Sequence, residues 1–581
     1  MANMKTRWTD SVSTSCPRNE YPRPQLVRED WLCLNGEYDY AITGEKSGRP
    51  ESFQGRITVP FAIECLLSGV QKPLNPADRL WYRKYFTVPD SFGGKRILLH
   101  FEAVDWQCEV YVNSVKAGEH LGGYIPFAFD ITKLLKPGEN ELIVRVYDPT
   151  DEGWQQRGKQ YLKPFGFWYT ATSGIWQSVW LEPVSENRID KIRFTPDIDK
   201  SVINVDTSVI GEGKLSARIT FAGESVFEGD IDAKAEIAVP DAKLWSPEEP
   251  NLYDIELTLT GKGTEDKVTS YFAMRKFSIV KDDKGLPRLA LNNRPYFQRG
   301  LLDQGYWPDG GLTAPTDEAM IFDISEMKRL GFNMLRKHIK VEARRWYYHC
   351  DRLGMIVWQD MVSGGKALNP IYAGALPNIN VNVRDNQYKI FHRDKPEWRE
   401  QFKDELFQML DHLYSYPCIG CWVPFNEGWG QFDAKEIAES IKAYDPSRIV
   451  DHASGWHDQK GIDLKSMHKY VVPITMPKLD GRPFVISEFG GYQNSVDGHL
   501  WRPGRTFGLY LKFKDKQRLS GAYEKLHRKQ VIPLITKGLC ATVYTQVSDV
   551  ECELNGMYTY DREVLKLNES TLTEINNLLK Y

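Results

Sequence analysis

The 581-residue sequence lacks most of the features that mark disulfide-rich, membrane-spanning or nucleic-acid-binding proteins. Its nine cysteines are an odd number without CxxC pairs, which favours reduced thiols over a disulfide framework. No apolar run approaches the roughly 18 residues of a transmembrane helix. The net charge of −4 and the pI near 6.3 give no general attraction to nucleic acid or to an anionic membrane.

The first twenty residues, MANMKTRWTDSVSTSCPRNE, also lack the apolar segment of a signal peptide. Together with the scattered cysteines this predicts a cytoplasmic protein, although an exported form stays open if a signal was removed. Phosphate-loop and HExxH metal motifs are absent as well, which argues against those two kinds of site.

The N-terminal half of the chain reads as β-strands separated by turns. Stretches such as KRILLHFEAVDWQCEVYVNSVKAGEH and NELIVRVYD alternate apolar and polar residues. This alternation therefore predicts a β-sandwich over residues 1–183. Shorter and more polar strands over residues 184–281 predict an immunoglobulin-like sandwich, without its Cys–Trp–Cys signature.

Residues 282–581 change to an alternation of short apolar strands and amphipathic helices. The pattern favours a (β/α)8 barrel. A doubly wound open sheet is the alternative, but no GxGxxG motif follows a strand. The first helix is predicted from an N-cap, one apolar face and a glycine C-cap, formed by Thr316, Met320, Ile321, Ile324, Met327, Leu330 and Gly331.

Two acids come at the ends of apolar strands of the expected barrel. Asn426 and Glu427 follow IGCWVPF, and Glu488 follows PFVIS. Because barrel enzymes carry their chemistry at the C-terminal ends of the strands, we expect both acids at one rim. Two carboxylates that flank one bond are what glycoside hydrolysis requires, by a retaining or an inverting route according to their separation.

Other strands of the expected barrel also end in polar groups. Each of these side chains has the alternative of a structural ion pair or a hydrogen bond to the backbone. Their accumulation at one predicted face favours a site. They are Arg336, His338, Lys340, Gln359, Asp360, His452, Trp456, His457, His468, Tyr470, Tyr544, Gln546 and Asp549.

Several motifs together resemble glycoside hydrolase family 2, which contains β-galactosidases, β-glucuronidases and β-mannosidases. The likeness covers nearly the whole chain. It rests on ITVPFAIE, WYRKYFTVP and LHFEAVDWQCEVYVNSVKAGEHLGGYIPFAFDIT, then on LWSPEEPNLYDIELTL and MRKFSI. In the last part it rests on LNNRPYFQRG, DISEMKRLGFNMLRKH, CDRLGMIVWQD, FNEGWGQ and ISEFGG.

The resemblance implies a jelly-roll domain, an immunoglobulin-like domain and a (β/α)8 barrel, with retention of anomeric configuration. It implies that Glu427 is the acid/base and Glu488 the nucleophile, with Asn426 on the sugar 2-hydroxyl. Tyr470 would orient Glu488, and Arg336 would keep it ionised. The substrate would be a carbohydrate, with neither metal nor other cofactor, and a homo-oligomer stays open.

The sequence also departs from the family pattern. RKH at residues 336–338 has one residue between Arg and His where two are common. The last strand offers Tyr544 and Thr545 in place of a tryptophan, and the Asn-x-Lys pair of β-glucuronidases is not evident near the end of the barrel. A neutral β-galactoside is therefore the leading substrate, with mannoside, arabinoside, galactofuranoside and, less favoured, glucuronide as alternatives.

Two long loops are candidates for the subsite that receives the leaving group. Residues 362–395 are long for a βα loop, and loops of such length are commonly functional lids. Residues 492–508 form the second candidate, with Trp501 as a stacking platform for sugar. The alternative for both is a packed surface loop.

Two rival functions remain at this stage. One is a carbohydrate-binding protein without turnover, which would have no need of the two acids. The other is a barrel enzyme such as an aldolase, which would require a Schiff-base lysine; Lys340 is the only nearby candidate.

Overall fold

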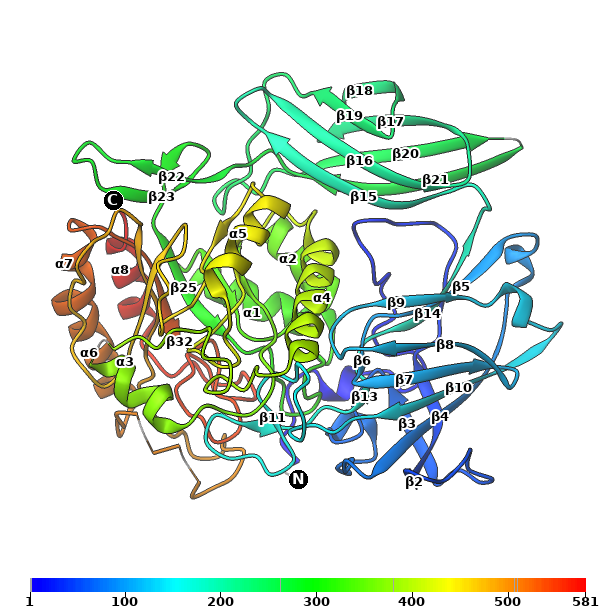
Figure 1. Ribbon diagram of the computed structural model, residues 1–581, viewed down its shortest axis with the longest axis horizontal. Coiled ribbons are helices and arrows are strands. Elements are labelled where there is room, and N and C mark those ends of the chain that lie inside the picture. The colour runs from blue at the N-terminus through cyan, green and yellow to red at the C-terminus, as the bar shows by residue number, and fades with distance from the viewer. Residues whose placement is uncertain (1–2, 262, 380, 506, 509) are drawn as a thin grey trace.

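The computed structural model describes residues 3–261, 263–379, 381–505, 507–508 and 510–581 as three domains (Figure 1). The jelly-roll sandwich and the immunoglobulin-like sandwich adjoin the barrel on different sides. None of the nine cysteines is paired. Among the described residues, no helix is both long enough and apolar enough to cross a membrane.

The N-terminal domain is the expected jelly-roll sandwich. Its larger sheet has the order β3-β2-β4-β10-β7-β8, and the facing sheet has the order β1-β14-β5-β9. Inward residues such as Tyr38, Leu80, Leu99 and Val144 are fully buried between the sheets. The strands are β1 (Leu32–Cys33), β2 (Gly36–Gly44), β3 (Gly55–Val59), β4 (Asp78–Thr87), β5 (Arg96–Phe101), β6 (Val104–Asp105), β7 (Gln107–Val112), β8 (Val115–Leu121), β9 (Phe127–Asp130), β10 (Glu139–Tyr147), β11 (Gln160–Tyr161), β12 (Tyr169–Thr170), β13 (Gly174–Ile175) and β14 (Val179–Val184).

The second domain packs a three-stranded sheet, β15-β16-β19, on a four-stranded sheet, β18-β17-β20-β21. Alternation decides which side of each strand is inside: Tyr253, Ile255, Leu257 and Leu259 of β20 are buried. The strands are β15 (Arg188–Asp197), β16 (Val202–Ile210), β17 (Lys214–Phe221), β18 (Glu224–Ile231), β19 (Lys234–Ala238), β20 (Tyr253–Gly261) and β21 (Thr264–Phe272).

A small antiparallel sheet adjoins the N-terminal end of the barrel. It consists of β22 (Phe277–Lys281), β23 (Pro287–Leu291) and β24 (Arg294–Pro295). The ring of Phe277 lies so close to Gly420, in β28, that a Cβ there would be 2.9 Å from it. This end of a barrel serves stability, so the chemistry is expected at the opposite end.

Eight parallel strands form the barrel sheet in the order β29-β28-β27-β26-β25-β32-β31-β30. Seven α-helices accompany them in the described residues from 317 onward, besides the short α3. No helix lies between β29 and β31, where loops replace two of the expected helices. The elements are β25 (Gln298–Asp303), α1 (Asp317–Arg329), β26 (Met334–Lys337), α2 (Arg344–Leu353), β27 (Ile356–Asp360), α3 (Leu376–Asn378), α4 (Pro396–Leu413), β28 (Ile419–Val423), α5 (Ala434–Tyr444), β29 (Ile449–Val450), β30 (Lys465–Lys469), β31 (Phe484–Gly490), α6 (Lys516–Leu526), α7 (Ile532–Ile535), β32 (Leu539–Thr545) and α8 (Glu569–Leu578).

The first barrel helix begins and ends as its sequence predicts. The Thr316 hydroxyl accepts a hydrogen bond from the N–H of Ala319. Gly331 follows the helix with a φ of +91°, and its N–H donates to the carbonyl oxygen of Lys328. Of the predicted apolar face only Ile321 is not fully buried.

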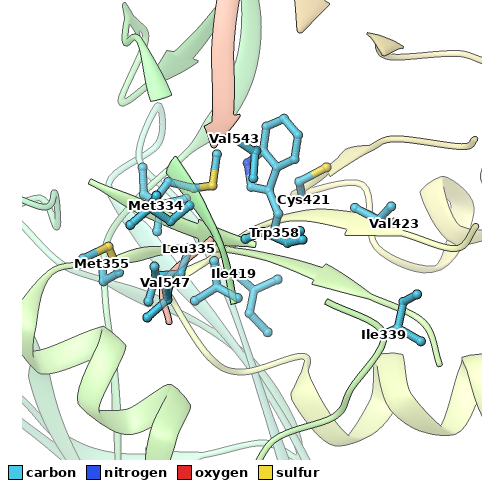
Figure 2. Close-up of a cluster of buried hydrophobic side chains, with 14 of the residues drawn as sticks. Met334, Leu335, Ile339, Met355, Trp358, Ile419, Cys421, Val423, Val543 and Val547 are labelled. Atoms are coloured by element: carbon cyan, nitrogen blue, oxygen red, sulfur yellow. The ribbon is translucent and has the colours of Figure 1, made fainter. Parts of the chain in front are cut away.

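Side chains from neighbouring strands fill the barrel interior. Figure 2 shows Met334 of β26, Trp358 of β27, Cys421 of β28 and Val543 of β32 gathered between the strands. Every residue of β26, β27 and β28 is buried, which explains why these strands begin with apolar residues and carry polar ones only toward their C-terminal ends. This packing fixes the strands, and with them the polar side chains at their C-terminal ends, such as Arg336 of β26 and Asp360 of β27.

Candidate active site

The structure brings Glu427 and Glu488 together at the C-terminal end of the barrel strands. Glu427 follows β28, and Glu488 lies within β31. A carboxylate oxygen of each acid and a ring nitrogen of His468 all lie within 4.8 Å of one another. The Glu488 side chain is 6% exposed, whereas that of Glu427 is 27% exposed. Two acids thus share one site, and one of them reaches solvent.

The backbone turns sharply at Glu427. Its φ is +51°, in the left-handed region that residues other than glycine seldom adopt. Its N–H donates to the carbonyl oxygen of Ser454 at 2.9 Å, and Asn426 pairs with Ser454 in an isolated parallel bridge. Such a conformation costs on the order of 1–3 kcal/mol and is concentrated at functional sites. The contacts with Ser454 hold this turn in place.

The strand that carries Glu488 is irregular at that point. The register of β31 shifts against β30 between Met467 and His468, and against β32 between Ile486 and Phe489. A bulge of this kind bends a strand and redirects its side chains. The result is a ladder in which Glu488 stands opposite His468.

Hydrogen-bond donors and positive charges surround Glu488. Arg336 donates from Nη1 to Oε1 at 3.1 Å, and the Tyr470 hydroxyl donates to Oε2 at 2.5 Å. Burial raises the pKa of Glu488, but His468, His338 and Arg336 outweigh burial and hold this pKa well below its ordinary value. Burial lowers the pKa of His338 far below its usual range, whereas Arg336 keeps its positive charge at neutral pH. Glu488 is therefore an anion.

Arg336 is fully buried and connects several polar groups of the site. Its Nε and Nη2 donate to the two oxygens of Asp360 at 2.9 and 3.0 Å. Nη2 also donates to Oδ1 of Asn426 at 2.8 Å, and Nη1 donates to the carbonyl oxygen of Ser487 at 3.1 Å. Asp360 in turn lies 2.8 Å from Nδ1 of His338. One guanidinium thus orients an amide, a carboxylate and, through it, an imidazole.

Glu427 has the opposite electrostatic setting. Burial raises its pKa, and the negative charge of Glu488 adds to this increase. The hydrogen bond between His468 Nδ1 and Glu427 Oε1, at 2.8 Å, acts against it. Nε2 of His468 lies 3.2 Å from the Ser454 hydroxyl, which fixes the ring. One acid therefore keeps its proton at a pH where the other has lost it.

The same three groups have the geometry of metal ligands. Glu427, His468 and Glu488 each offer an atom within reach of a common point. However, a divalent cation there would lie beside the buried positive charge of Arg336, and it would compete with the Tyr470 hydrogen bond to Glu488. The donor set fits a protonated acid and a carboxylate better than it fits a metal.

The structure does not bring Lys340 to the acids. Its Nζ donates to the carbonyl oxygens of Gly305 and Leu312 at 2.7 Å and to Glu342 at 2.6 Å. Burial lowers the pKa of Lys340 to about 8. Since three protein acceptors occupy the ammonium, no donor is left for a sugar.

His452 and Gln546 are likewise occupied elsewhere. Nε2 of His452 accepts from the backbone N–H groups of Gln459 and Gly461 at 3.3 and 3.1 Å. Gln546 donates from Nε2 to the Asn555 side chain at 2.7 Å. Both side chains are fully buried and organise their own loops.

Two aromatic candidates, Tyr544 and Trp501, are packed against other aromatic rings. The ring of Tyr544 contacts Phe489 and Tyr523, with centroids 5.4 and 5.0 Å apart. Trp501 is 8% exposed and packs edge-on against Tyr560 at 5.5 Å, so its faces do not form an open sugar platform. Neither ring touches the acids, and the sequence pattern alone could not distinguish core from site.

The long loop at residues 362–395, apart from residue 380, which lies outside the described residues, packs beside the segment that follows Glu427. Arg393 donates to the carbonyl oxygen of Gly430 at 3.1 Å, and Asp385 accepts from the Gln431 side chain at 3.1 Å. The loop therefore lies beside the turn that carries Glu427. In the second candidate loop, residues 492–508, residue 506 also lies outside the residues that the structure describes.

Three residues near the acids were not predicted from the sequence. Ser454 holds the Glu427 turn, as described above. Tyr510 packs its ring 5.2 Å from that of Tyr470. Lys159 belongs to the jelly-roll domain, yet its charge acts on both acids. Reasoning from barrel strands could not find a residue that another domain supplies.

Three family models match the chain in succession. "Glycosyl hydrolases family 2, sugar binding domain" matches residues 34–184, "Glycosyl hydrolases family 2" matches residues 187–275, and "Glycosyl hydrolases family 2, TIM barrel domain" matches residues 285–490. These matches cover most of the chain and follow its three domains in order.

Relatives with curated names share only about a quarter of the aligned residues with this chain. A β-galactosidase of Thermoanaerobacter pseudethanolicus is 27% identical over 63% of this chain and 47% of the relative. A putative β-glucuronidase of Formosa agariphila is 27% identical over 74% of this chain and 53% of the relative. The chain thus spans about half the length of the curated relatives it matches.

Solved structures share the complete fold. A Ruminococcus gnavus β-glucuronidase superposes with a TM-score of 0.76 over 96% of this chain and 99% of its own, at 17% identity. A β-glucuronidase of an uncultured Clostridium species gives a TM-score of 0.73 at 16% identity, over 96% of this chain and 99% of its own. With the domain order, the strand-end acids and the family models in agreement, the chain belongs to glycosyl hydrolase family 2.

Proposed function

We propose that this protein is an exo-acting, retaining β-glycosidase that removes a terminal sugar by double displacement. Glu488 attacks the anomeric carbon and forms a glycosyl-enzyme, while Glu427 protonates the leaving oxygen. Water, deprotonated by Glu427, then releases the sugar. The reaction needs no cofactor, and the unpaired cysteines support a reducing compartment such as the cytoplasm.

The spacing of the two acids carries this proposal. Their nearest ligand atoms lie within 4.8 Å of each other. Retaining glycosidases have carboxyl groups about 5–5.5 Å apart, whereas inverting ones leave about 6.5–9.5 Å for a water molecule. The close pair in this chain supports direct attack by a carboxylate.

The electrostatic contrast supports the division of roles. A nucleophile must be ionised, and Arg336 and Tyr470 stabilise the anion of Glu488. An acid/base must hold a proton, and burial beside Glu488 raises the pKa of Glu427. A binding protein without turnover would not need two acids with separated pKa values.

Asn426 is poised for the sugar 2-hydroxyl. Its Oδ1 accepts from Arg336 at 2.8 Å, so the amide orientation is set and its N–H₂ is directed elsewhere. The amide stands directly before Glu427 in the chain. A contact to the 2-hydroxyl that strengthens in the transition state would supply part of the catalysis.

For the sugar, a neutral β-galactoside is the leading proposal, with a mannoside, arabinoside, galactofuranoside or glucuronide as alternatives. The relatives named above include both a β-galactosidase and β-glucuronidases. The loop at residues 362–395 borders Glu427 and would contact the leaving group. A panel of nitrophenyl β-glycosides decides among these sugars.

Removal of either acid tests the mechanism. We expect Glu488→Ala to lose more than about 10⁴-fold in kcat and Glu427→Ala to lose about 10²–10⁴-fold. Azide should rescue Glu488→Ala with an α-glycosyl azide product and Glu427→Ala with a β-product. Full activity in either variant would remove that acid from the mechanism.

The pH profile should be bell-shaped. Glu488 has a depressed pKa, so activity is retained down to the acid side of the ordinary glutamate value of 4.5 and falls as this carboxylate becomes protonated. Glu427 has a raised pKa, so activity falls as pH rises through a value above 4.5. Measurement of kcat/KM against pH checks both limbs. An acid limb above pH 4.5 that persists in Glu427→Ala would contradict the assignment to Glu488.

Tyr470→Phe should remove a hydrogen bond that stabilises the ionised form of Glu488. A hydrogen bond to a charged group contributes about 1.5–3 kcal/mol, so kcat should fall by roughly 10- to 100-fold. The acid limb should move to higher pH because Glu488 loses a donor. Tyr544→Phe is the matched control, since the ring of Tyr544 lies in the core, and it should change kcat by less than about threefold. Equal effects of the two substitutions would contradict the account.

A further inference from the structure

Lys159 lies at the junction of the jelly-roll domain and the catalytic end of the barrel. The N–H of the preceding Gly158 donates to the carbonyl oxygen of Ser363 at 2.9 Å. A Cβ on Gly158 would lie 3.1 Å from the carbonyl oxygen of Ile339, which follows His338. The backbone beside Lys159 therefore touches the segment that follows β26, the strand that carries Arg336.

The segment around Lys159 is held firmly. Its carbonyl oxygen accepts from the N–H of Tyr169 at 2.8 Å. The next residue, Gln160, donates to Asp105 at 2.8 Å and accepts from the Thr172 N–H at 2.6 Å. Gln160 is buried, so the position of the Lys159 backbone is fixed by the core of its own domain.

The ammonium of Lys159 is unpaired, unlike the other cations near the site. Within the described part of the chain, it has neither an ion-pair partner nor a hydrogen-bond acceptor. Its protein neighbours are the rings of Phe167 and Tyr169, each with its centroid 5.8 Å from Nζ. Arg336 and Lys340, by contrast, donate to several protein acceptors. A half-buried ammonium with free donors favours a ligand that brings acceptors.

A row of aromatic rings connects Lys159 with the acids. Phe167 packs against Phe507 at 5.2 Å, Phe507 against Tyr510 at 5.2 Å, and Tyr510 against Tyr470 at 5.2 Å. Tyr470 is the last ring of this row, and its hydroxyl donates a hydrogen bond to the carboxylate of Glu488 in β31. The row thus links Phe167 of the jelly-roll domain with Tyr470 of the barrel.

The electrostatics agree with this placement. The positive charge of Lys159 lowers the pKa of both catalytic candidates, after the larger effects of burial and of nearer groups. One cation thus acts on both of the acids between which the proposed function puts the sugar ring.

We propose that Lys159 is a specificity-determining residue whose ammonium donates a hydrogen bond to an oxygen of the sugar bound between Glu427 and Glu488. The inference rests on the proposed function and adds a sugar contact supplied by the jelly-roll domain. The oxygen belongs to a ring hydroxyl or to a carboxylate at C5, both of which accept from an ammonium.

The test compares Lys159→Met with Lys163→Met, a matched control at an exposed lysine of the same segment. We expect Lys159→Met to lower kcat/KM by about 10- to 100-fold and to weaken inhibition by the free monosaccharide similarly. Lys163→Met should leave both unchanged. A greater loss on the nitrophenyl glucuronide than on the galactoside assigns the contact to a carboxylate, and an equal loss assigns it to a hydroxyl.

Two outcomes separate this inference from the proposed function. If Lys159→Met shifts the pH limbs but leaves monosaccharide affinity and KM unchanged, Lys159 acts only through the acids and the contact is refuted. If the wild-type protein hydrolyses no glycoside, the proposed function fails, while calorimetry with the monosaccharide still measures the effect of Lys159→Met on binding. Lys159→Gln, which keeps a donor but no charge, repeats the test if the methionine variant does not fold.

Discussion

The buried guanidinium of Arg336 is the interaction on which the rest of the site depends. It has no exposed surface, and its donors face Asp360, Glu488, Asn426 and a backbone carbonyl. Loss of one partner from a buried ion pair costs about 3–5 kcal/mol, because the remaining charge is left without compensation. Ionisation of Glu488 and orientation of Asn426 are therefore two consequences of one buried charge. Both interactions are strengthened because the barrel core excludes water from Arg336.

Around this charge, the site combines parts of different origin. The strands supply Arg336 and Glu488, whose positions are fixed by complete burial of β26 and by the bulge in β31. Glu427 instead stands on a strained turn that Ser454 holds. The loop at residues 362–395 and the jelly-roll segment around Gly158 pack against the same end of the barrel. Rigid strands thus carry Glu488, while loops surround Glu427, for which we propose the part of proton donor.

The sequence predicted the architecture well because its signals are local and physical. Alternation marks the strands of both sandwiches, and an N-cap at Thr316 with a glycine at 331 marks a barrel helix. Glu427 and Glu488 were singled out because a charge at the end of a buried strand has few structural uses; the structure brings them together, and their catalytic roles stay a prediction. Lys340, His452, Tyr544, Gln546 and Trp501 satisfied the same rule by position, but their side chains are occupied by carbonyls, amides or core rings. Only tertiary contacts reveal such occupation, and only they reveal Lys159, which reaches the barrel from another domain.

The most direct measurement traps the glycosyl-enzyme with a 2-deoxy-2-fluoro glycosyl fluoride of the sugar that the nitrophenyl panel identifies. The fluorine destabilises the oxocarbenium-like transition states, and the fluoride leaving group lets the first step outrun the second. Mass spectrometry of the digested protein should then find one sugar on the peptide that contains Glu488 and none on the peptide that contains Glu427. A label on Glu427, or steady turnover of natural glycosides with inversion and no trapped intermediate, would contradict the account.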